Sequence, residues 1–193
     1  MKIAVVILAG GEGRRIGGDK PLRLLGGRRL IDRAEELTRQ WSEILAVSVR
    51  YAGQIGRTDL ACITDEPGID GPLGGLVAAL RFAKLSGCRA VLTIPADMPF
   101  LPGDLKKRLS EALGDAGASL ASSGGHLHPV CGLWSARALD SVPDYLASGR
   151  RSLKGFAETV GYSSVEWPSE PSDPFSNINS AEDLAAAERL LQA

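Results

Sequence analysis

The sequence predicts a single three-layer α/β/α domain with a mostly parallel, Rossmann-like central sheet. Short apolar runs rich in valine and isoleucine alternate with amphipathic helical stretches, which is the pattern of an α/β fold. The first run, KIAVVIL at residues 2–8, is continuously apolar after its lysine, as expected for a strand covered on both faces. The chain has 193 residues, 44% of them hydrophobic, with no internal repeat and no long linker, so we expect one domain over residues 1–193.

Each element follows from its local pattern of apolar residues. Strands are predicted at residues 2–8, 44–49, 61–64, 90–94, 118–121, 130–134 and 162–165. Helices are predicted at residues 30–40, 73–85, 103–113, 136–147 and 153–160. Residues 9–29 are predicted to form a loop, as are residues 168–174, which hold three prolines in seven positions. A last helix is predicted from Ser180, since the sequence S-A-E-D supplies an N-cap and a carboxylate three residues later.

The bulk composition excludes several classes of protein. A net charge of −1 gives no overall field that would draw the chain onto nucleic acid or an anionic membrane, so neither is expected as a partner. The apolar run at the amino end is too short for a secretory signal or for a membrane span of about 20 residues. Cys62, Cys88 and Cys131 are odd in number and far apart, which favours free thiols in a reducing compartment. We therefore expect a soluble protein of the cytoplasm.

A glycine-rich segment, LAGGEGRRIGGDKP at residues 8–21, directly follows the first strand. It therefore emerges at the carboxyl end of the sheet, where open α/β folds bind ligands. Its glycines let backbone N–H groups approach a ligand closely, and Arg14, Arg15 and Lys20 add three positive charges beside them. This combination predicts a phosphate site, and an ordinary flexible turn is the alternative.

Two familiar phosphate motifs do not fit this segment. A P-loop needs Gly-Lys followed by serine or threonine, whereas Asp19 precedes Lys20 here and Pro21 follows it. A dinucleotide fingerprint needs G-x-G-x-x-G, whereas the glycine that follows Gly13 stands at Gly17, one residue late. The segment is therefore a different kind of phosphate-binding loop.

Two aspartates stand at the ends of other predicted strands. Asp97 follows the strand at 90–94 and should face the same crevice as the glycine-rich segment, where one carboxylate suffices for Mg²⁺ that also bridges phosphates. The alternative role of Asp97 is a turn or cap residue before Pro99. Asp65 follows the strand at 61–64, and its carboxylate could accept hydrogen bonds from guanine or from ribose hydroxyls; a solvated acidic loop is its alternative.

At this point a family resemblance is evident. The segment LAGGEGRRIGGDKPL resembles the L-A-G-G-x-x-x-R-M-G-x-D-K motif of nucleotidyltransferases, with Ile16 in the methionine place. Its later motifs are similar to the MobA family of molybdenum cofactor guanylyltransferases, whose reaction transfers GMP from GTP to the terminal phosphate of molybdopterin. The resemblance implies Mg²⁺ as cofactor, bound by Asp97, and implies that Arg15, Lys20 and Asp97 are catalytic. It further implies a nucleotide site made of Leu8, Ala9, Gly10, Gly11, Lys20, Asp65, Gly74 and Asp97.

The resemblance assigns residues 1–100 to the nucleotide-binding half and residues 101–193 to the acceptor-binding half. Residues 125–133 resemble the family's H-P-x-x-G-L segment, and residues 175–184 resemble its F-x-N-x-N-T-P-E-D-L motif, with serine and alanine replacing threonine and proline. The acceptor residues expected from these segments and from the arginine pair before residue 153 are His128, Arg151, Asn177 and Asn179. Arg151 could instead belong to a solvated basic loop, and the asparagines could only brace the loop before the last helix.

One family position differs in this chain. Many relatives carry asparagine near the end of the second strand, where this sequence reads Val47-Ser48-Val49-Arg50. The asparagine's contact with the nucleotide is therefore either lost or taken over by Ser48.

Two rival functions remain. A cytidylyltransferase or another nucleotidyltransferase acting on a different small phosphorylated acceptor would share the same loop chemistry. A non-catalytic nucleotide-binding module is the rival from another class, although Lys20 and Asp97 beside the loop argue against it. The expected partners are GTP and molybdopterin as substrates, with transient contacts to proteins that supply or accept the cofactor.

Overall fold

A seven-stranded sheet runs through the centre of the molecule in the computed structural model, which describes residues 1–11 and 20–192. Its strands lie in the order β5 (Ala61–Thr64), β4 (Leu45–Val49), β1 (Ile3–Leu8), β6 (Ala90–Pro95), β8 (His126–Ser135), β7 (Ala118–Ser123) and β9 (Tyr162–Trp167). β8 is antiparallel to both of its neighbours, and the other neighbouring pairs are parallel. The prediction of an α/β fold with a mostly parallel sheet is confirmed.

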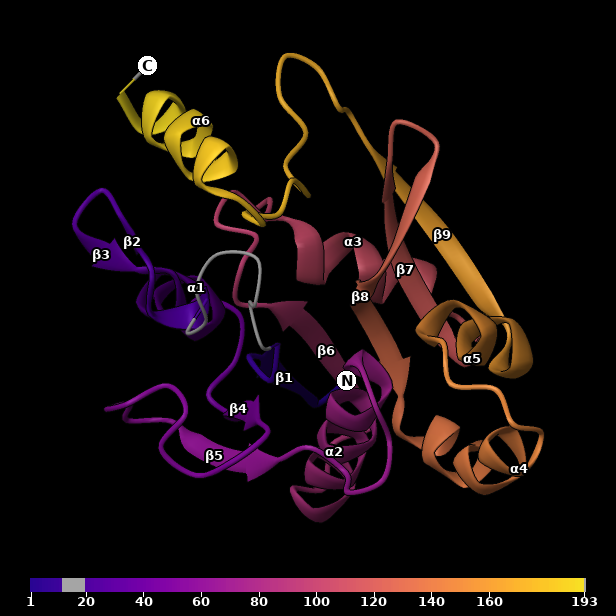
Figure 1. The fold of residues 1–193 in the computed structure, drawn as a ribbon. Helices are drawn as coiled ribbons and strands as arrows, with labels where there is room; N and C mark the ends of the chain where they lie inside the picture. Colours follow the sequence, from indigo (N-terminus) through magenta and orange to yellow (C-terminus); the bar gives the residue numbers. More distant parts are fainter. Residues whose placement is uncertain (12–19, 193) are drawn as a thin grey trace.

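Helices cover both faces of this sheet (Figure 1). On one face, α1 (Leu30–Arg39) and α3 (Leu105–Ala112) contribute to one hydrophobic core. On the other face, α2 (Pro72–Leu85), α4 (Val142–Ala147) and α5 (Leu153–Val160) contribute to a second core. The last helix, α6 (Ala181–Gln192), lies apart from both cores and packs beside β2 (Leu24–Leu25) in a third, smaller cluster.

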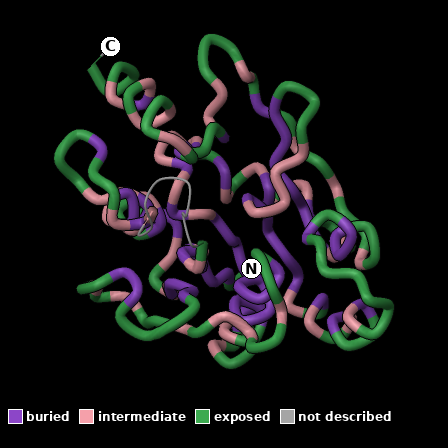
Figure 2. Tube along the Cα trace, in the orientation of Figure 1, coloured by how far each residue is buried: buried purple, intermediate pink, exposed green. Residues whose placement is uncertain are grey.

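The first strand shows why the central strands read as continuous apolar runs. Ile3, Val5 and Ile7 belong to the core with α1 and α3, whereas Ala4 and Val6 belong to the core with α2. Both faces of β1 are therefore shielded from water, and neither face needs polar residues. Figure 2 shows the consequence: the central strands are buried, whereas the hairpin tips and the outer loops are exposed.

Two regions differ from the elements that the sequence predicts. The described part of the expected loop at 9–29 contains a short 3-10 helix, η2 (Lys20–Leu22), and a hairpin of β2 and β3 (Arg28–Arg29). Gly26 and Gly27 form its turn with φ of 57° and 73°, a conformation that glycine adopts without steric cost. The helix expected at 136–147 is instead a 3-10 helix, η3 (Ala136–Ser141), followed by α4, because Pro143 has no N–H to continue the earlier turns and favours a new helix start.

The predicted start of the last helix is confirmed. The backbone N–H of Asp183 donates to Ser180 Oγ at 3.1 Å, and the N–H of Ser180 donates back to Asp183 Oδ2 at 2.9 Å. This reciprocal pair is a capping box in which aspartate replaces the usual glutamate.

The strand order creates a crevice beside β1. From β1 the chain passes through α1 to β4 on one side, whereas β6 is added on the other side of β1 after α2. Leu8 pairs in register with Ser48 of β4 and with Pro95 of β6, so the carboxyl ends of the three strands are level. Such a switch point, where successive connections leave in opposite directions, is where open α/β sheets bind ligands. Among the described residues, no helix has the length and apolar character that a membrane span requires.

Candidate active site

A pocket opens at the carboxyl ends of β1, β4 and β6, at the switch point of the sheet. Its lining residues are Leu8, Ala9, Gly10, Gly11, Lys20, Pro21, Arg50, Asp65, Gly71, Pro72, Gly75, Pro95, Ala96, Asp97 and Val130. The described residues predicted to bind the nucleotide all line this pocket except Gly74. Arg15 lies outside the described residues.

Hydrogen bonds to neighbouring strands hold the glycine-rich segment at its entry. Ala9 N–H donates to the Ser48 carbonyl at 2.8 Å, and Ala96 N–H donates to the Leu8 carbonyl at 3.1 Å. Gln54, which is buried, donates its side-chain amide to the Ala9 carbonyl at 3.2 Å. The backbone that leads into Gly10 is therefore held by β4, by the loop that follows β4 and by the segment that follows β6.

Glycine at position 10 is required by the closeness of Asp65. A Cβ atom at Gly10 would overlap the Asp65 carboxylate, with Cγ of Asp65 at 3.2 Å and Cγ of Arg50 at 3.4 Å. At Gly11 a Cβ atom would meet nothing within 4 Å among the described residues. The first glycine of the pair thus admits the carboxylate of Asp65, which directly follows β5.

Asp65 is held from behind by Ser48. Ser48 is fully buried on β4, and its hydroxyl donates to Asp65 Oδ1. The Asp65 N–H also donates to the Val49 carbonyl at 2.8 Å. Ser48 is not among the described residues that line the pocket, so its role there is to orient the Asp65 carboxylate, which does line it.

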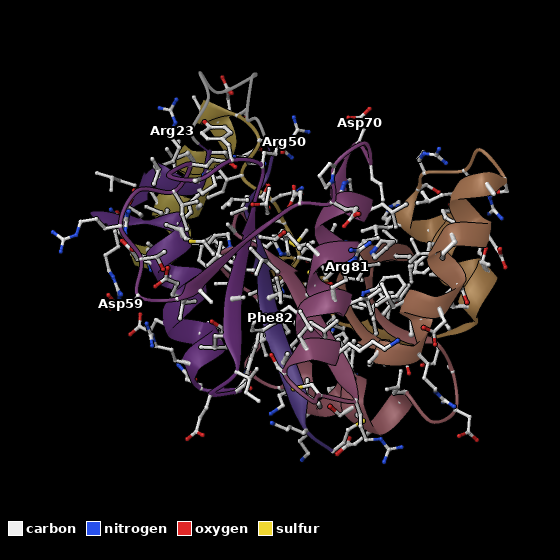
Figure 3. The ribbon with its side chains drawn as sticks, turned by 90° about the horizontal axis from the view of Figure 1, so that it is seen from below. Arg23, Arg50, Asp59, Asp70, Arg81 and Phe82 are labelled. Atoms are coloured by element: carbon white, nitrogen blue, oxygen red, sulfur yellow. The ribbon has the colours of Figure 1, made fainter. Side chains whose placement is uncertain are left out.

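The amino end of α2 forms the next part of the wall. Gly71 adopts φ of 74°, and Gly71, Pro72 and Gly75 line the pocket. Gly74, next to Gly75 in the sequence, packs against the preceding loop. A Cβ atom at Gly74 would lie 2.6 Å from the Ile69 carbonyl oxygen, and the Gly74 carbonyl accepts a hydrogen bond from Glu66 N–H at 3.1 Å. Gly74 therefore shapes the loop that carries Asp65 and does not itself line the pocket. Figure 3 shows Asp70, in this loop, projecting on the same side of the molecule as Arg50.

Lys20 joins three separate segments at the other side of the pocket. Its Nζ forms an ion pair with Asp97 Oδ2 and donates to Asn179 Oδ1 at 2.6 Å. The loop that carries Asp97 is itself tied to the same C-terminal segment, because Ile178 N–H donates to the Asp97 carbonyl at 3.0 Å. A lysine from the glycine-rich segment, an aspartate after β6 and an asparagine before α6 therefore converge on one point.

The donor set at this point fits a Mg²⁺ ion. Mg²⁺ takes hard oxygen ligands and keeps several waters when it bridges phosphates, so one carboxylate suffices. Among the described residues, no group of three or more histidine, cysteine, aspartate or glutamate side chains that could hold a metal ion occurs. The cationic Nζ of Lys20 contacts oxygens of both Asp97 and Asn179, which are hard oxygen donors of the kind that Mg²⁺ takes.

The expected acceptor residues separate into three places. His128 lies on β8, where its Nε2 is 2.7 Å from Ser123 Oγ and its ring stacks on Phe175 with centroids 4.8 Å apart. Asn177 is exposed in the segment before α6. Arg151 lies between α4 and α5, where its guanidinium donates to the Leu146 and Arg150 carbonyls at 2.8 and 2.7 Å. The fourth, Asn179, accepts a hydrogen bond from Lys20, which lines the pocket.

Comparison with known proteins identifies the family to which the chain belongs. A family profile described as MobA-like NTP transferase domain matches residues 5–161. A molybdenum cofactor guanylyltransferase of Cereibacter sphaeroides is 41% identical over 198 residues, which cover 100% of this chain and 98% of the relative. The chain belongs to the MobA-like NTP transferase family.

Further relatives support the same membership. A molybdenum cofactor guanylyltransferase of Bradyrhizobium is 40% identical, with 96% of this chain and 91% of the relative covered. The crystal structure of molybdopterin-guanine dinucleotide biosynthesis protein A from Archaeoglobus fulgidus superposes with a TM-score of 0.77 at 26% identity, covering 100% of this chain and 99% of that one. The chain is thus a nucleotidyltransferase, and its mostly parallel sheet is the fold of MobA-like proteins.

Several residues at the site of this MobA-like protein were not predicted from the sequence. Arg50 follows the end of β4 directly, so the criterion that selected Asp65 and Asp97 could also have selected it. Val130 reaches the pocket from β8, where the pairing with β7 shifts register between Leu120 and Ala121. No local pattern marks Ser123, which contacts His128 only because β7 and β8 pair.

Proposed function

We propose that this chain transfers GMP from GTP to the terminal phosphate of molybdopterin and releases pyrophosphate, which forms the guanine dinucleotide form of the molybdenum cofactor. The observation that carries the proposal is one pocket lined by the glycine pair, Lys20, Asp65 and Asp97 at the switch point of the sheet. The 41% identity over the whole chain to a molybdenum cofactor guanylyltransferase supports guanine as the base and molybdopterin as the acceptor.

The reaction needs positioning and neutralisation of charge more than proton transfer. An oxygen of the acceptor phosphate forms a bond to the α-phosphorus of GTP, while the bond from that phosphorus to pyrophosphate breaks and its electron pair leaves with pyrophosphate. A phosphate monoester has a second pKa of about 6 and is largely dianionic at pH 7, so no strong general base is required. Lys20 neutralises the leaving pyrophosphate, and Arg15 shares this role on the strength of the family motif.

Asp97 is the residue that would hold Mg²⁺, with Asn179 beside it. When bound, Mg²⁺ supplies Lewis-acid neutralisation of negative charge on the phosphate oxygens. The backbone amides of Gly10 and Gly11 orient the phosphates, and Asp65 accepts hydrogen bonds from the base or from the ribose hydroxyls. Mg²⁺ dependence is part of this proposal, as are the roles of the individual residues.

The two halves of the chain divide the substrates between them. We assign the nucleotide to residues 1–100 and the acceptor to residues 101–193 of one domain. In the described parts of the chain, Val130 is the single pocket-lining residue from the second half, and Asn179 adds a contact to Lys20 from the same half. Free thiols at Cys62, Cys88 and Cys131 support a cytoplasmic location, where transient contacts with cofactor-supplying and cofactor-accepting proteins would occur.

A transfer assay tests the proposal directly. The full chain is mixed with Mg²⁺, molybdopterin and GTP labelled at the α-phosphate, and labelled product and pyrophosphate are measured. We expect both products with GTP, much less with CTP, ATP or UTP, and neither from a folded Asp97→Asn variant. Preferred use of CTP would assign the chain to the cytidylyltransferases, and a folded, nucleotide-binding protein that transfers nothing would be a binding module.

A further inference from the structure

A hydrogen-bonded chain joins His128 to Ser123, on the neighbouring strand of the β7–β8 hairpin, and to Asp173, in a loop 50 positions further along the sequence. Nε2 of His128 lies 2.7 Å from Ser123 Oγ, and the Ser123 hydroxyl donates to Asp173 Oδ1 at 2.8 Å. The same Asp173 oxygen accepts from Phe175 N–H at 2.9 Å. Ser123 ends β7 and is 1% exposed, His128 lies on β8, and Asp173 belongs to the loop between β9 and α6.

The direction of these bonds determines which nitrogen of His128 carries the proton. The Ser123 hydroxyl has one proton, which it donates to Asp173, so its oxygen can only accept from the imidazole. Nε2 must then be the protonated nitrogen, and Nδ1 keeps a lone pair in the neutral ring. Burial lowers the pKa of His128 below its usual value, with His126 acting in the same direction and with Asp173 and Glu166 opposing it, which favours the neutral ring at pH 7.

This order of residues excludes a hydrolase-type nucleophile. In a Ser-His-Asp triad the serine gives its proton to histidine, and the aspartate orients the histidine. Here Ser123 stands in the middle and gives its proton to Asp173, so its oxygen is not activated for attack. The chain of bonds can orient the imidazole but cannot create a nucleophile.

The imidazole of His128 is held on one face and at one of its two nitrogens. Phe175 covers one face of the imidazole, at an interplanar angle of 12°, and the Ser123 bond holds Nε2, while the residue as a whole stays partly exposed. Two residues further along β8, Val130 lines the pocket described above. His128 is therefore a fixed ring two residues along β8 from Val130, which lines the proposed reaction pocket.

We infer that Ser123 and Asp173 are positioning residues that hold His128 as its Nε2–H tautomer, so that Nδ1 accepts a hydrogen bond from an N–H or O–H group of the acceptor substrate. This inference rests on the proposed function for the identity of that substrate. It assigns Ser123 and Asp173 to the acceptor half of the reaction, although neither touches the reacting phosphates. The acceptor class is one that carries a polar heterocycle or hydroxyls beside its phosphate, as molybdopterin does.

Nuclear magnetic resonance can read the tautomer without any substrate. The chain has two histidines, so ¹⁵N-histidine labelling with a His126→Gln variant assigns both rings. We expect the Nε2–H tautomer for His128 in the wild type, a mixed or Nδ1–H signal in Ser123→Ala and Asp173→Ala, and recovery in Ser123→Thr, which keeps the hydroxyl. Ser122→Ala is the matched control, because this neighbouring buried hydroxyl pairs with Ser164 Oγ at 2.9 Å and should leave His128 unchanged.

Steady-state kinetics then test the connection to the acceptor. Loss of one oriented hydrogen bond of about 1.4 kcal/mol should raise KM for the acceptor roughly tenfold in Ser123→Ala, with KM for GTP unchanged and with Ser123→Thr near the wild type. An Nδ1–H tautomer in the wild type, or a Ser123→Ala variant with unchanged ring signals and unchanged acceptor KM, would overturn the inference. If the wild type shows the Nε2–H tautomer but transfers no GMP, the proposed function fails while the assigned hydrogen-bond chain stands.

Discussion

Lys20 forms an ion pair with Asp97, and this contact joins the end of the glycine-rich segment to the loop after β6. Both side chains are largely buried, with 12% and 18% of their side-chain surface exposed. The cation proposed to neutralise pyrophosphate and the carboxylate proposed to hold the metal therefore meet at the wall of one pocket. Their separate removal gives the most direct test of the chemistry.

Lys20→Ala and Asp97→Ala should each lower kcat by about 100-fold or more, because each removes charge aimed at the phosphates. The fold should persist, since neither residue belongs to a hydrophobic core. Turnover and the thermal midpoint are measured together, with Lys154→Ala, an exposed lysine of α5, as control. A variant with near-normal turnover would remove its residue from the mechanism.

Lys20→Met should strengthen binding of a divalent metal in the absence of nucleotide. Two cations compete for the Asp97 carboxylate, and the neutral methionine removes one of them at similar length. Titration of the nucleotide-free protein with Mn²⁺ should show a several-fold lower Kd than in the wild type. Asp97→Asn in the same background should abolish the gain, and equal or weaker binding in Lys20→Met would show that the lysine does not compete with the metal.

Gly10→Ala should weaken nucleotide binding and lower stability by about 1–3 kcal/mol, the usual cost of overpacking. The new Cβ atom would overlap the Asp65 carboxylate, which is bound to Ser48 behind it and cannot move freely. Gly11→Ala is the matched control for stability, because its Cβ atom meets nothing within 4 Å among the described residues. Chemical denaturation measures the free energy of unfolding of both variants. An equal loss of stability in both would indicate backbone strain and would contradict the predicted overlap with Asp65.

Ser48→Ala should raise the Kd for GTP about tenfold, because Asp65 loses the hydroxyl that orients it; a bond to a charged group contributes about 1.5–3 kcal/mol. Fluorescence or calorimetric titration with GTP measures the change. Ser163→Ala is the control: it removes a serine hydroxyl that donates to a neutral acceptor, the Ala112 carbonyl at 2.7 Å, and Ser163 is not among the described residues that line the pocket. Similar GTP affinity in both variants would mean that Ser48 supports only the packing of β4 on β5.

Ser180→Ala should lower the free energy of unfolding by about 1 kcal/mol at neutral pH, the usual loss when an N-cap is removed. Ser141→Ala is the control, since Ser141 also precedes a helix but its side chain makes no capping bond. The backbone N–H of Asn179, with further bonds from Ser180, lowers the pKa of Asp183 in the folded state.

The stabilisation by Asp183 is therefore present above the usual carboxyl pKa and is lost as pH falls through the lowered folded-state pKa. Asp183→Ala should accordingly destabilise the protein at neutral pH and lose this effect in acid. An effect that does not change with pH would show that the carboxylate charge plays no part in the cap.

The predicted strands and helices agree with the structure where a segment is long enough for its apolar residues to show a regular spacing. The strand at 61–64 and the helix at 153–160 have the predicted bounds. The β2–β3 hairpin escaped prediction because two-residue strands contain no period. β8 begins at His126, earlier than predicted, because its first residues pair with β7 but include two histidines and therefore do not form a continuous apolar run.

The sequence by itself determined the α/β class, the glycine-rich segment with its cations, and the aspartates placed after the strands at 61–64 and 90–94. These features depend on local periodicity and on which residue follows a strand, and both can be read along the chain. Only the tertiary structure decided that Lys20 meets Asn179, 159 positions away, and that Ser123 meets Asp173, 50 positions away. Such contacts depend on strand order, register and the path of the final loop, which are set by the packing of the whole sheet and leave no local pattern.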